Sequence, residues 1–111
     1  MTVTVKVLIP SKIAEATQTT QYTATNIKTL IDKFTATNYS AVTATISVNL
    51  VTAADTVGNQ NLTVKLKSLQ PGETYTFPEI VGQALDTGGF ISTIAGTATA
   101  ITIRSSGREI T

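Results

Sequence analysis

The sequence predicts an all-β protein folded as an antiparallel β-sandwich, either immunoglobulin-like or jelly-roll-like. The stretch 41–51, AVTATISVNLV, alternates apolar with small or polar residues, and a period of two indicates a strand with one buried face. Its apolar members are Val42, Ala44, Ile46, Val48 and Leu50. Thr, Val and Ile make up about two fifths of the chain, an enrichment typical of pleated surfaces. Turn signals recur about every ten residues, which gives about eight short strands.

The chain has 111 residues and no internal linker, so we expect one domain over 1–111. Only 14% of its residues are charged, against about 25% in an average domain. A surface with few ions loses little hydration when it is covered. This composition suits a protein whose surface contacts other subunits. A Thr-rich sandwich that stays unassociated is an equally open alternative.

The first predicted strand begins near the N-terminus, where Val3, Val5 and Val7 alternate with polar residues. We expect it to stop at Pro10, because proline cannot donate to a ladder. The following residues, 11–16, are predicted to form a loop. The polar stretch 17–25 is predicted to be a second strand at a sheet edge.

The stretch 26–38 allows two interpretations. Spacings of three and four residues favour a helix that Asn26 could cap; the residues are Ile27, Leu30, Ile31 and Phe34. Residues 33–38 alternate instead, and Thr is a poor helix former. We therefore predict a strand with a bulge near Leu30 and Ile31. A tight connection at 38–40 then joins it to 41–51 as a hairpin.

The second half of the chain predicts further short strands. Leu62, Val64 and Leu66 begin one strand after the turn-rich loop 52–61, with its lysines facing outwards. Pro71 and Gly72 predict a type II turn before a short strand at 74–77. One or two helical turns are expected within 78–85, and the ranges 90–95 and 98–106 supply the last pair of strands.

The side-chain inventory argues against catalysis. The chain has no His and no Cys, which removes the usual ligands of zinc sites and the imidazole or thiol groups of many enzymes. Most carboxylates fall at expected turns or loops, where solvation and capping are their ordinary roles. We therefore expect no enzyme, no cofactor and no metal.

Charge and hydropathy limit the expected partners. A net charge of +1 gives no general electrostatic attraction to nucleic acid, so no nucleic-acid partner is expected. No apolar run approaches the ~20 residues that span a bilayer, and the N-terminus does not resemble a signal peptide. We expect no membrane insertion.

Three exposed residues are candidates for contact with a partner. Tyr39 lies at an expected turn tip, although packing at the end of a hairpin is its more ordinary role. Lys65 and Lys67 are two apart and would form a small basic stripe on one face of a strand. Lysines on an edge strand also commonly prevent unwanted pairing. The dipeptide Asp32–Lys33 is interpreted as part of a cross-strand or edge ion pair.

The order of turns in the C-terminal half carries a resemblance. A Pro-Gly-acidic turn at 71–73 is followed by Val81-Gly82 with Leu85, then by a turn at Gly88-Gly89 and a closing Ser-Gly-Arg-Glu-Ile strand at 106–110. Over about 26–111 the chain resembles the small β-sandwich structural proteins of tailed bacteriophages. These are decoration, head-fibre, collar or tail accessory subunits. The resemblance implies a virion component, assembled in the cytoplasm of the bacterial host, and carries over no catalytic residue.

These observations predict a non-enzymatic virion protein that forms a symmetric homo-oligomer, of which a trimer is one candidate form. It would dock on the capsid, neck or tail and contact other virion proteins. The strand at 1–10 is expected to contribute to subunit contacts through Val3, Val5 and Val7, because an open strand can pair with a neighbour. The alternative is a receptor- or glycan-binding module of a phage tail, for which Tyr39 and the loop 52–61 are the candidate contacts.

Overall fold

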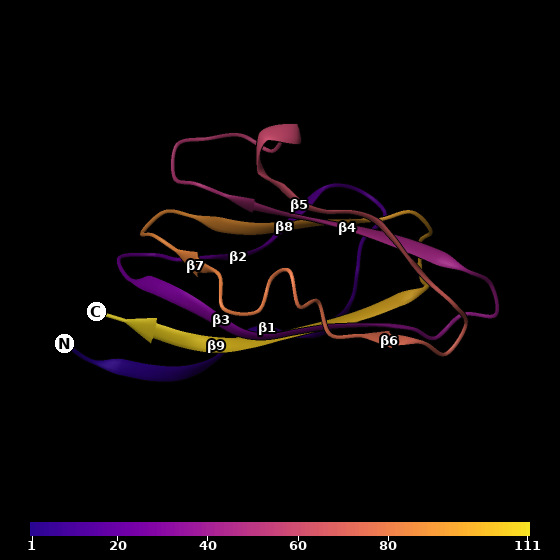
Figure 1. Ribbon diagram of the computed structural model, residues 1–111, viewed down its shortest axis with the longest axis horizontal. Coiled ribbons are helices and arrows are strands. Elements are labelled where there is room, and N and C mark those ends of the chain that lie inside the picture. The colour runs from indigo at the N-terminus through magenta and orange to yellow at the C-terminus, as the bar shows by residue number, and fades with distance from the viewer.

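The chain folds into two antiparallel β-sheets packed face to face, as seen in a computed structural model that describes residues 1–111 (Figure 1). The nine strands are β1 (Val3–Ile13), β2 (Thr19–Thr23), β3 (Lys28–Asn38), β4 (Ala44–Val51), β5 (Leu62–Leu69), β6 (Thr74–Tyr75), β7 (Ala84–Leu85), β8 (Phe90–Ala95) and β9 (Ile101–Ile110). A 3-10 helix, η1 (Asn59–Asn61), is the one helical element. The predicted antiparallel sandwich is confirmed.

The strand order resolves which kind of sandwich this is. Sheet A has the order β1-β9-β3-β6, with β7 also paired to β3, and sheet B has the order β2-β8-β4-β5. The pairs are nested: β1 with β9, β2 with β8, β3 with β6 and β7, and β4 with β5. A long hairpin wrapped across two sheets gives this order, which is that of a jelly roll. The nesting places both termini at the same end of the molecule (Figure 1).

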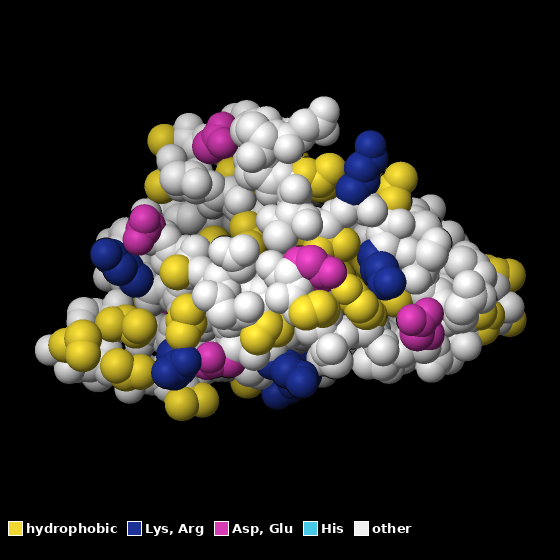
Figure 2. Space-filling view, viewed as in Figure 1, with side chains coloured by type: hydrophobic (Ala, Val, Ile, Leu, Met, Phe, Trp, Pro, Cys, Tyr) yellow, Lys and Arg dark blue, Asp and Glu magenta, His cyan; other side chains and the backbone are white.

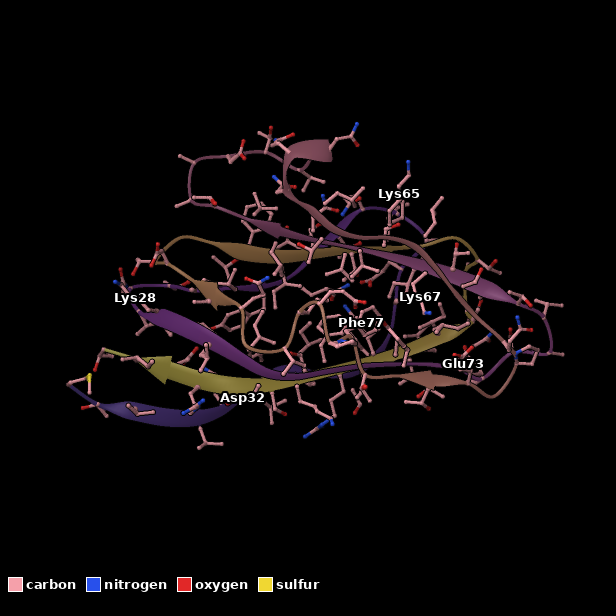
Figure 3. All side chains as sticks on the ribbon, viewed as in Figure 1. Lys28, Asp32, Lys65, Lys67, Glu73 and Phe77 are labelled. Carbon is pink, nitrogen blue, oxygen red and sulfur yellow. The ribbon has the colours of Figure 1, made fainter.

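The core lies between the two sheets and contains 20 buried apolar residues. Its centre is aromatic: the Phe34 and Phe77 rings meet edge to face with centroids 4.9 Å apart. Tyr75 packs edge-on against Phe77 at 4.7 Å. Aromatic pairs prefer such offset or edge-on geometries, and each buried ring removes a large apolar surface from water. Phe77, labelled in Figure 3, projects into the space between the sheets.

The interpretation of 26–38 as a strand is confirmed. β3 pairs with β9 over most of its length, and its register shifts between Ile31 and Lys33, next to the predicted bulge. The residues Phe34, Ala36 and Asn38 are buried, as their alternation predicts. β2 is confirmed as an edge strand of sheet B.

The predicted hairpin of 26–38 with 41–51 is wrong, because β3 and β4 lie in different sheets. Buried Asn38 holds this crossing. Its Nδ2 donates to the carbonyl oxygens of Val42 (2.7 Å) and Leu69 (2.9 Å), while its Oδ1 accepts from the Ser40 backbone N–H (2.9 Å). The amide therefore takes the place of a hairpin ladder. The strand that forms a hairpin with β4 is β5, across the loop 52–61, and the other neighbour of β4 is β8.

Two expected boundaries are also wrong. β1 does not stop at Pro10 but runs to Ile13. The first half of the expected loop 11–16 is therefore part of the strand. Proline is tolerated because β1 is an edge strand with register shifts between Val7 and Lys12. The last strand, expected at 98–106, is β9 and runs from Ile101 to Ile110. The range 90–95 does form β8, but β8 and β9 lie in different sheets and are not a pair.

No helix forms at 78–85. The segment makes one hydrogen-bonded turn, in which the Ile80 and Val81 N–H groups both donate to the Phe77 carbonyl at 3.0 and 3.2 Å, and then enters β7. The expected strand at 74–77 is shorter, because Phe77 adopts φ +42° and leaves the sheet.

The alternation that marked 41–51 holds only in part. Ala44, Ile46 and Val48 are buried as predicted, but Ser47 and Asn49 on the opposite face are buried too. The loop 52–61 folds over that face, and the Asn49 Nδ2 donates to the Gly58 carbonyl (3.1 Å) and to Asn61 Oδ1 (2.8 Å). Asn49 therefore bonds the loop, whereas the Ser47 hydroxyl accepts a hydrogen bond from the Leu66 N–H of β5.

Candidate assembly surface

The outer edge of β1 presents unpaired backbone groups. The Thr111 N–H donates to the Thr2 carbonyl at 3.0 Å, and residues 3–7 of β1 continue in the same register against Ile110–Ser106 of β9. In an antiparallel pair, residues that bond the neighbour alternate with residues that point away. Thr2, Thr4 and Lys6 therefore bond β9. The N–H and C=O groups of Val3, Val5 and Val7 face outwards from the sheet.

The same three valines are exposed in their side chains. Their exposed fractions are 49% for Val3, 83% for Val5 and 41% for Val7. They share one face of β1, because alternate residues of a strand project to the same side. Partly buried Leu30 and Ile110 occupy neighbouring positions on that face, opposite or beside Arg108 and Lys28. Figure 2 shows hydrophobic side chains gathered at the end of the molecule where Figure 1 places the two termini.

Ion pairs border this apolar row on both faces of sheet A. Arg108 makes a bidentate pair with Asp32, with Nε–Oδ2 and Nη2–Oδ1 distances of 3.0 and 2.9 Å. The hydrogen bonds to Asp32 raise the pKa of Arg108. On the other face, Lys6 Nζ lies 3.4 Å from Glu109 Oε1. The cross-strand interpretation of Asp32 agrees with this geometry, although its partner is Arg108 of β9. The charges next to the valines are thus already compensated within the chain.

The other sheet edges are interrupted. β6 and β7 have two residues each, and β2 shifts register between Thr20 and Tyr22. β5 shifts register between its pairs with Ile46, Val48 and Asn49. Short, bulged edges discourage pairing with other chains. Only β1 offers five consecutive residues in regular register at an edge, from Val3 to Val7.

Lys65 and Lys67 do not form the predicted basic stripe, and the prediction of a shared face is wrong. Leu66 adopts φ +48° and its N–H donates to Ser47 Oγ at 2.9 Å, which places a bulge between the two lysines. Lys67 is consequently opposite buried Ile46, whereas Lys65 is exposed. Figure 3 shows Lys65 projecting away from the sandwich and Lys67 directed towards the opposite sheet.

Lys67 bridges the two sheets. Its ammonium lies 4.3 Å from the ring centroid of Tyr75, a cation–π contact. The Tyr75 hydroxyl donates to Glu79 at 2.6 Å. This bond raises the pKa of Tyr75 and lowers that of Glu79, whose carboxylate Lys67 also favours. A charge that points inwards on edge strand β5 is a recognised way of blocking edge pairing.

Tyr39 is half-exposed at 50%, at the point where the chain crosses from β3 to β4. Its backbone N–H donates to the Ala100 carbonyl at 3.0 Å. The residue is therefore held at the crossing between sheets, not at the end of a hairpin. It lies beside the start of β9, whereas Val3 faces Ile110 at the opposite end of that strand. The aromatic ring that Lys67 contacts is Tyr75, not Tyr39.

A polar pocket of about 380 Å³ lies between the loop 52–61 and the segment 83–89. Its polar lining includes Asp55, Gln60, Asn61, Gln83 and Asp86. Sequence reasoning identified the loop as a candidate contact but missed the second segment, because the two are far apart in the chain. Asp55 and Asn61 are engaged within the loop: Asn61 Nδ2 donates to the Thr56 carbonyl at 2.9 Å, and Asp55 Oδ1 accepts from the Thr56 N–H at 2.8 Å.

No group of three or more metal-binding side chains converges in the structure. None of its helices has the length and apolar character needed to cross a membrane. Comparison with protein-family models, with curated proteins and with solved structures found no match. The strand order and the β1 register define a jelly-roll sandwich with one regular open edge.

Proposed function

We propose that this chain is a non-enzymatic structural subunit of a tailed-phage virion, forming a symmetric homo-oligomer that docks on the capsid, neck or tail. The observation that carries the proposal is the β1 edge, where outward-facing backbone groups and exposed Val3, Val5 and Val7 occur on one regular strand. Such an edge is a template for pairing with another chain. Proteins that remain alone usually shorten, charge or bulge their edges.

The surface composition supports an assembly role. With 14% charged residues and 23 hydroxyl groups from threonine, the exterior can be covered with little desolvation of ions. Weak contacts of this kind add up when many copies bind a symmetric particle. Each copy needs only modest affinity, since a particle presents a repeated surface.

The resemblance to tailed-phage sandwich proteins is the second support. The sequence segments that carry it form turns: the Glu73 N–H donates to the Gln70 carbonyl at 3.0 Å with Gly72 at φ +79°, and Gly88 has φ +91° in the turn before β8. Viral capsid proteins and lectins both include jelly rolls. That comparison is an analogy at the level of fold, and the function still depends on the surface.

Co-sedimentation tests this proposal. Purified chain is mixed with virions of the phage that encodes it, at increasing chain concentration, and the pelleted protein is quantified. We expect saturable binding at a fixed number of copies per particle. Virions of an unrelated phage serve as the control. Binding that is absent, or equal on both particles, would contradict a structural role in the virion.

A tail module that binds a host receptor or glycan is the second candidate. The polar pocket between the 52–61 loop and the 83–89 segment favours it, because amide and carboxylate groups can bind sugar hydroxyls. A cell-binding assay run beside co-sedimentation separates the two functions. Binding to host cells without binding to particles would favour the receptor-binding module. Substitution of Gln83 by Ala in the pocket should then weaken cell binding.

A further inference from the structure

We propose that β1 of one copy pairs antiparallel with β1 of a second copy, about a two-fold axis that passes beside Val5. The two A sheets then form one continuous sheet across the dimer. This inference rests on the proposed assembly role and names the partner surface that the role requires. It is carried by three separate features of the edge: its backbone, its side-chain register and the contrast with the other edges.

The backbone provides the bonding groups. Since Thr2 bonds Thr111, the pairing of β1 with β9 uses the N–H and C=O groups of Thr2, Thr4 and Lys6. The corresponding groups of the three valines point to the open side. When Val5 meets Val5 of the second copy, Val3 meets Val7 and Val7 meets Val3. Each such pair exchanges two hydrogen bonds, so the edge forms about six.

The side chains select this register. Centred on Val5, every valine faces a valine, and Lys6 faces Thr4 of the second copy. Centred one residue further, on Lys6, the two lysines would face each other directly, which destabilises a sheet. Centred on Thr4, Val3 would meet Val5 and Val7 would meet Met1, so fewer valines face valines. Apolar β-branched pairs stabilise antiparallel strands.

Charge does not oppose the arrangement. Lys6 is 3.4 Å from Glu109 in its own chain, and Arg108 is paired with Asp32. The two basic side chains nearest the joined valines are therefore already paired within their own chain. By contrast, β5 is bulged and carries the inward-facing Lys67, and β2, β6 and β7 lack five regular residues. β1 is the edge of this fold that can extend a sheet.

The symmetry of the contact determines its stoichiometry. An antiparallel strand pair is isologous, so it closes after two copies and yields a dimer, not a trimer. Five residues of one strand bury less than the roughly 1,200 Å² of a standard interface. We therefore expect a dissociation constant of about 10 μM to 1 mM.

Cysteine trapping tests the register directly, because the chain has no cysteine of its own. Opposed residues in such a pair have Cα atoms about 5.5 Å apart, within disulfide range. On oxidation, Val5→Cys should form a covalent dimer. Val3→Cys alone and Val7→Cys alone should not, because each would lie about 13 Å from its own copy. A 1:1 mixture of these two variants should cross-link efficiently.

The outcomes are decisive for the pairing. Cross-linking of Val5→Cys and of the mixture, with little in the two single variants, supports it. Equal cross-linking of all variants would show random collision and overturn it, as would none in any folded variant. A partner strand from another virion protein would also leave Val5→Cys monomeric.

Proline provides an independent test. Val5→Pro removes an N–H that β9 does not use, so the fold should persist by circular dichroism while concentration-dependent dimerisation is lost. The matched control, Thr4→Pro, removes a bond to β9 and should loosen β1 itself. A Val5→Pro protein that still dimerises would overturn the inference. If Val5→Pro loses dimerisation but still co-sediments with virions, the pairing is not needed for docking and the proposed docking role stands. If the wild-type protein dimerises but does not co-sediment with virions, the docking role fails while the pairing stands.

Discussion

Tyr22 of β2 donates a 2.5 Å hydrogen bond to Glu109 of β9, so one phenol links sheet B to sheet A. Its hydroxyl also lies 2.7 Å from Thr29 Oγ1 of β3. Glu109 in turn pairs with Lys6 of β1. This chain of contacts connects the interior of the sandwich to the strand that we propose as the assembly edge.

The Tyr22 contact predicts a loss of stability at high pH. Burial and the hydrogen bond to Glu109 raise the pKa of Tyr22 from 10.0 to about 12. Below pH 10 the phenol is neutral in both states and its contribution is complete; between pH 10 and about 12 the unfolded chain ionises first, so that contribution is lost. Urea unfolding should show the wild type more stable than Tyr22→Phe by about 1 kcal/mol at pH 8. The difference should shrink as pH rises. A difference independent of pH would contradict this assignment.

Asn38 should be among the most sensitive polar positions. Asn38→Ala removes the amide, so the buried Leu69 carbonyl loses this donor. The segment that crosses from β3 to β4 also loses its hydrogen bond to the Val42 carbonyl. We expect a loss of about 2–3 kcal/mol in the free energy of unfolding. Ser40→Ala removes a partly exposed hydroxyl that donates to Asn38 Oδ1. This variant should lose less free energy of unfolding than Asn38→Ala. Chemical denaturation measures the free energy of unfolding of both variants. Equal losses would show that the Asn38 amide donors do not account for the stabilisation.

Gly107 is required by close packing. A Cβ at this position would collide with the backbone carbonyl of Leu30 and would lie 2.9 Å from Leu8 Cδ1. Gly107→Ala should therefore destabilise the fold by about 1–3 kcal/mol, as overpacking does. Ser106→Ala, at the adjacent and partly exposed position, should change stability by less than about 0.5 kcal/mol. Thermal unfolding of the two variants compares them, and an unaffected Gly107→Ala would refute the packing argument.

The two lysines of β5 should behave differently. Lys67→Gln removes the contact with the Tyr75 ring, so we expect the unfolded fraction to rise about two- to five-fold. Lys65→Gln, on the exposed side of the bulge, should leave it unchanged. Matched denaturation curves test the contrast. Identical curves for the two variants would mean that the inward position of Lys67 carries no stabilisation.

Much of the fold is readable from the sequence because period-two alternation reports burial directly. The strand at 26–38 was resolved by Thr and alternation against a competing helical spacing, and β2 was correctly placed at an edge. Sheet membership was not readable. The sequence favours a hairpin of β3 with β4 because only two residues separate the expected ends of the two strands. The Asn38 side chain instead replaces the ladder, and the chain crosses to the other sheet.

The candidate site shows the same division. The valines of β1 were identified because nothing interrupts their alternation, and their exposure is a property of that edge. The lysines of β5 were misplaced because Leu66 adopts a positive φ that its sequence does not signal. One residue in a bulge reverses every later side chain of a strand. The pocket beside the 52–61 loop needs two distant segments, so no local pattern could indicate it.

Amide hydrogen exchange along β1, followed by NMR at low and high protein concentration, tests the central claim most directly. The Thr4 and Lys6 amides bond β9 and should be protected at every concentration. We predict that the Val5 and Val7 amides exchange rapidly in dilute solution and become protected only as the dimer forms. Rapid exchange of both valine amides at all concentrations, with Thr4 and Lys6 still protected, would contradict the pairing of two copies through this edge.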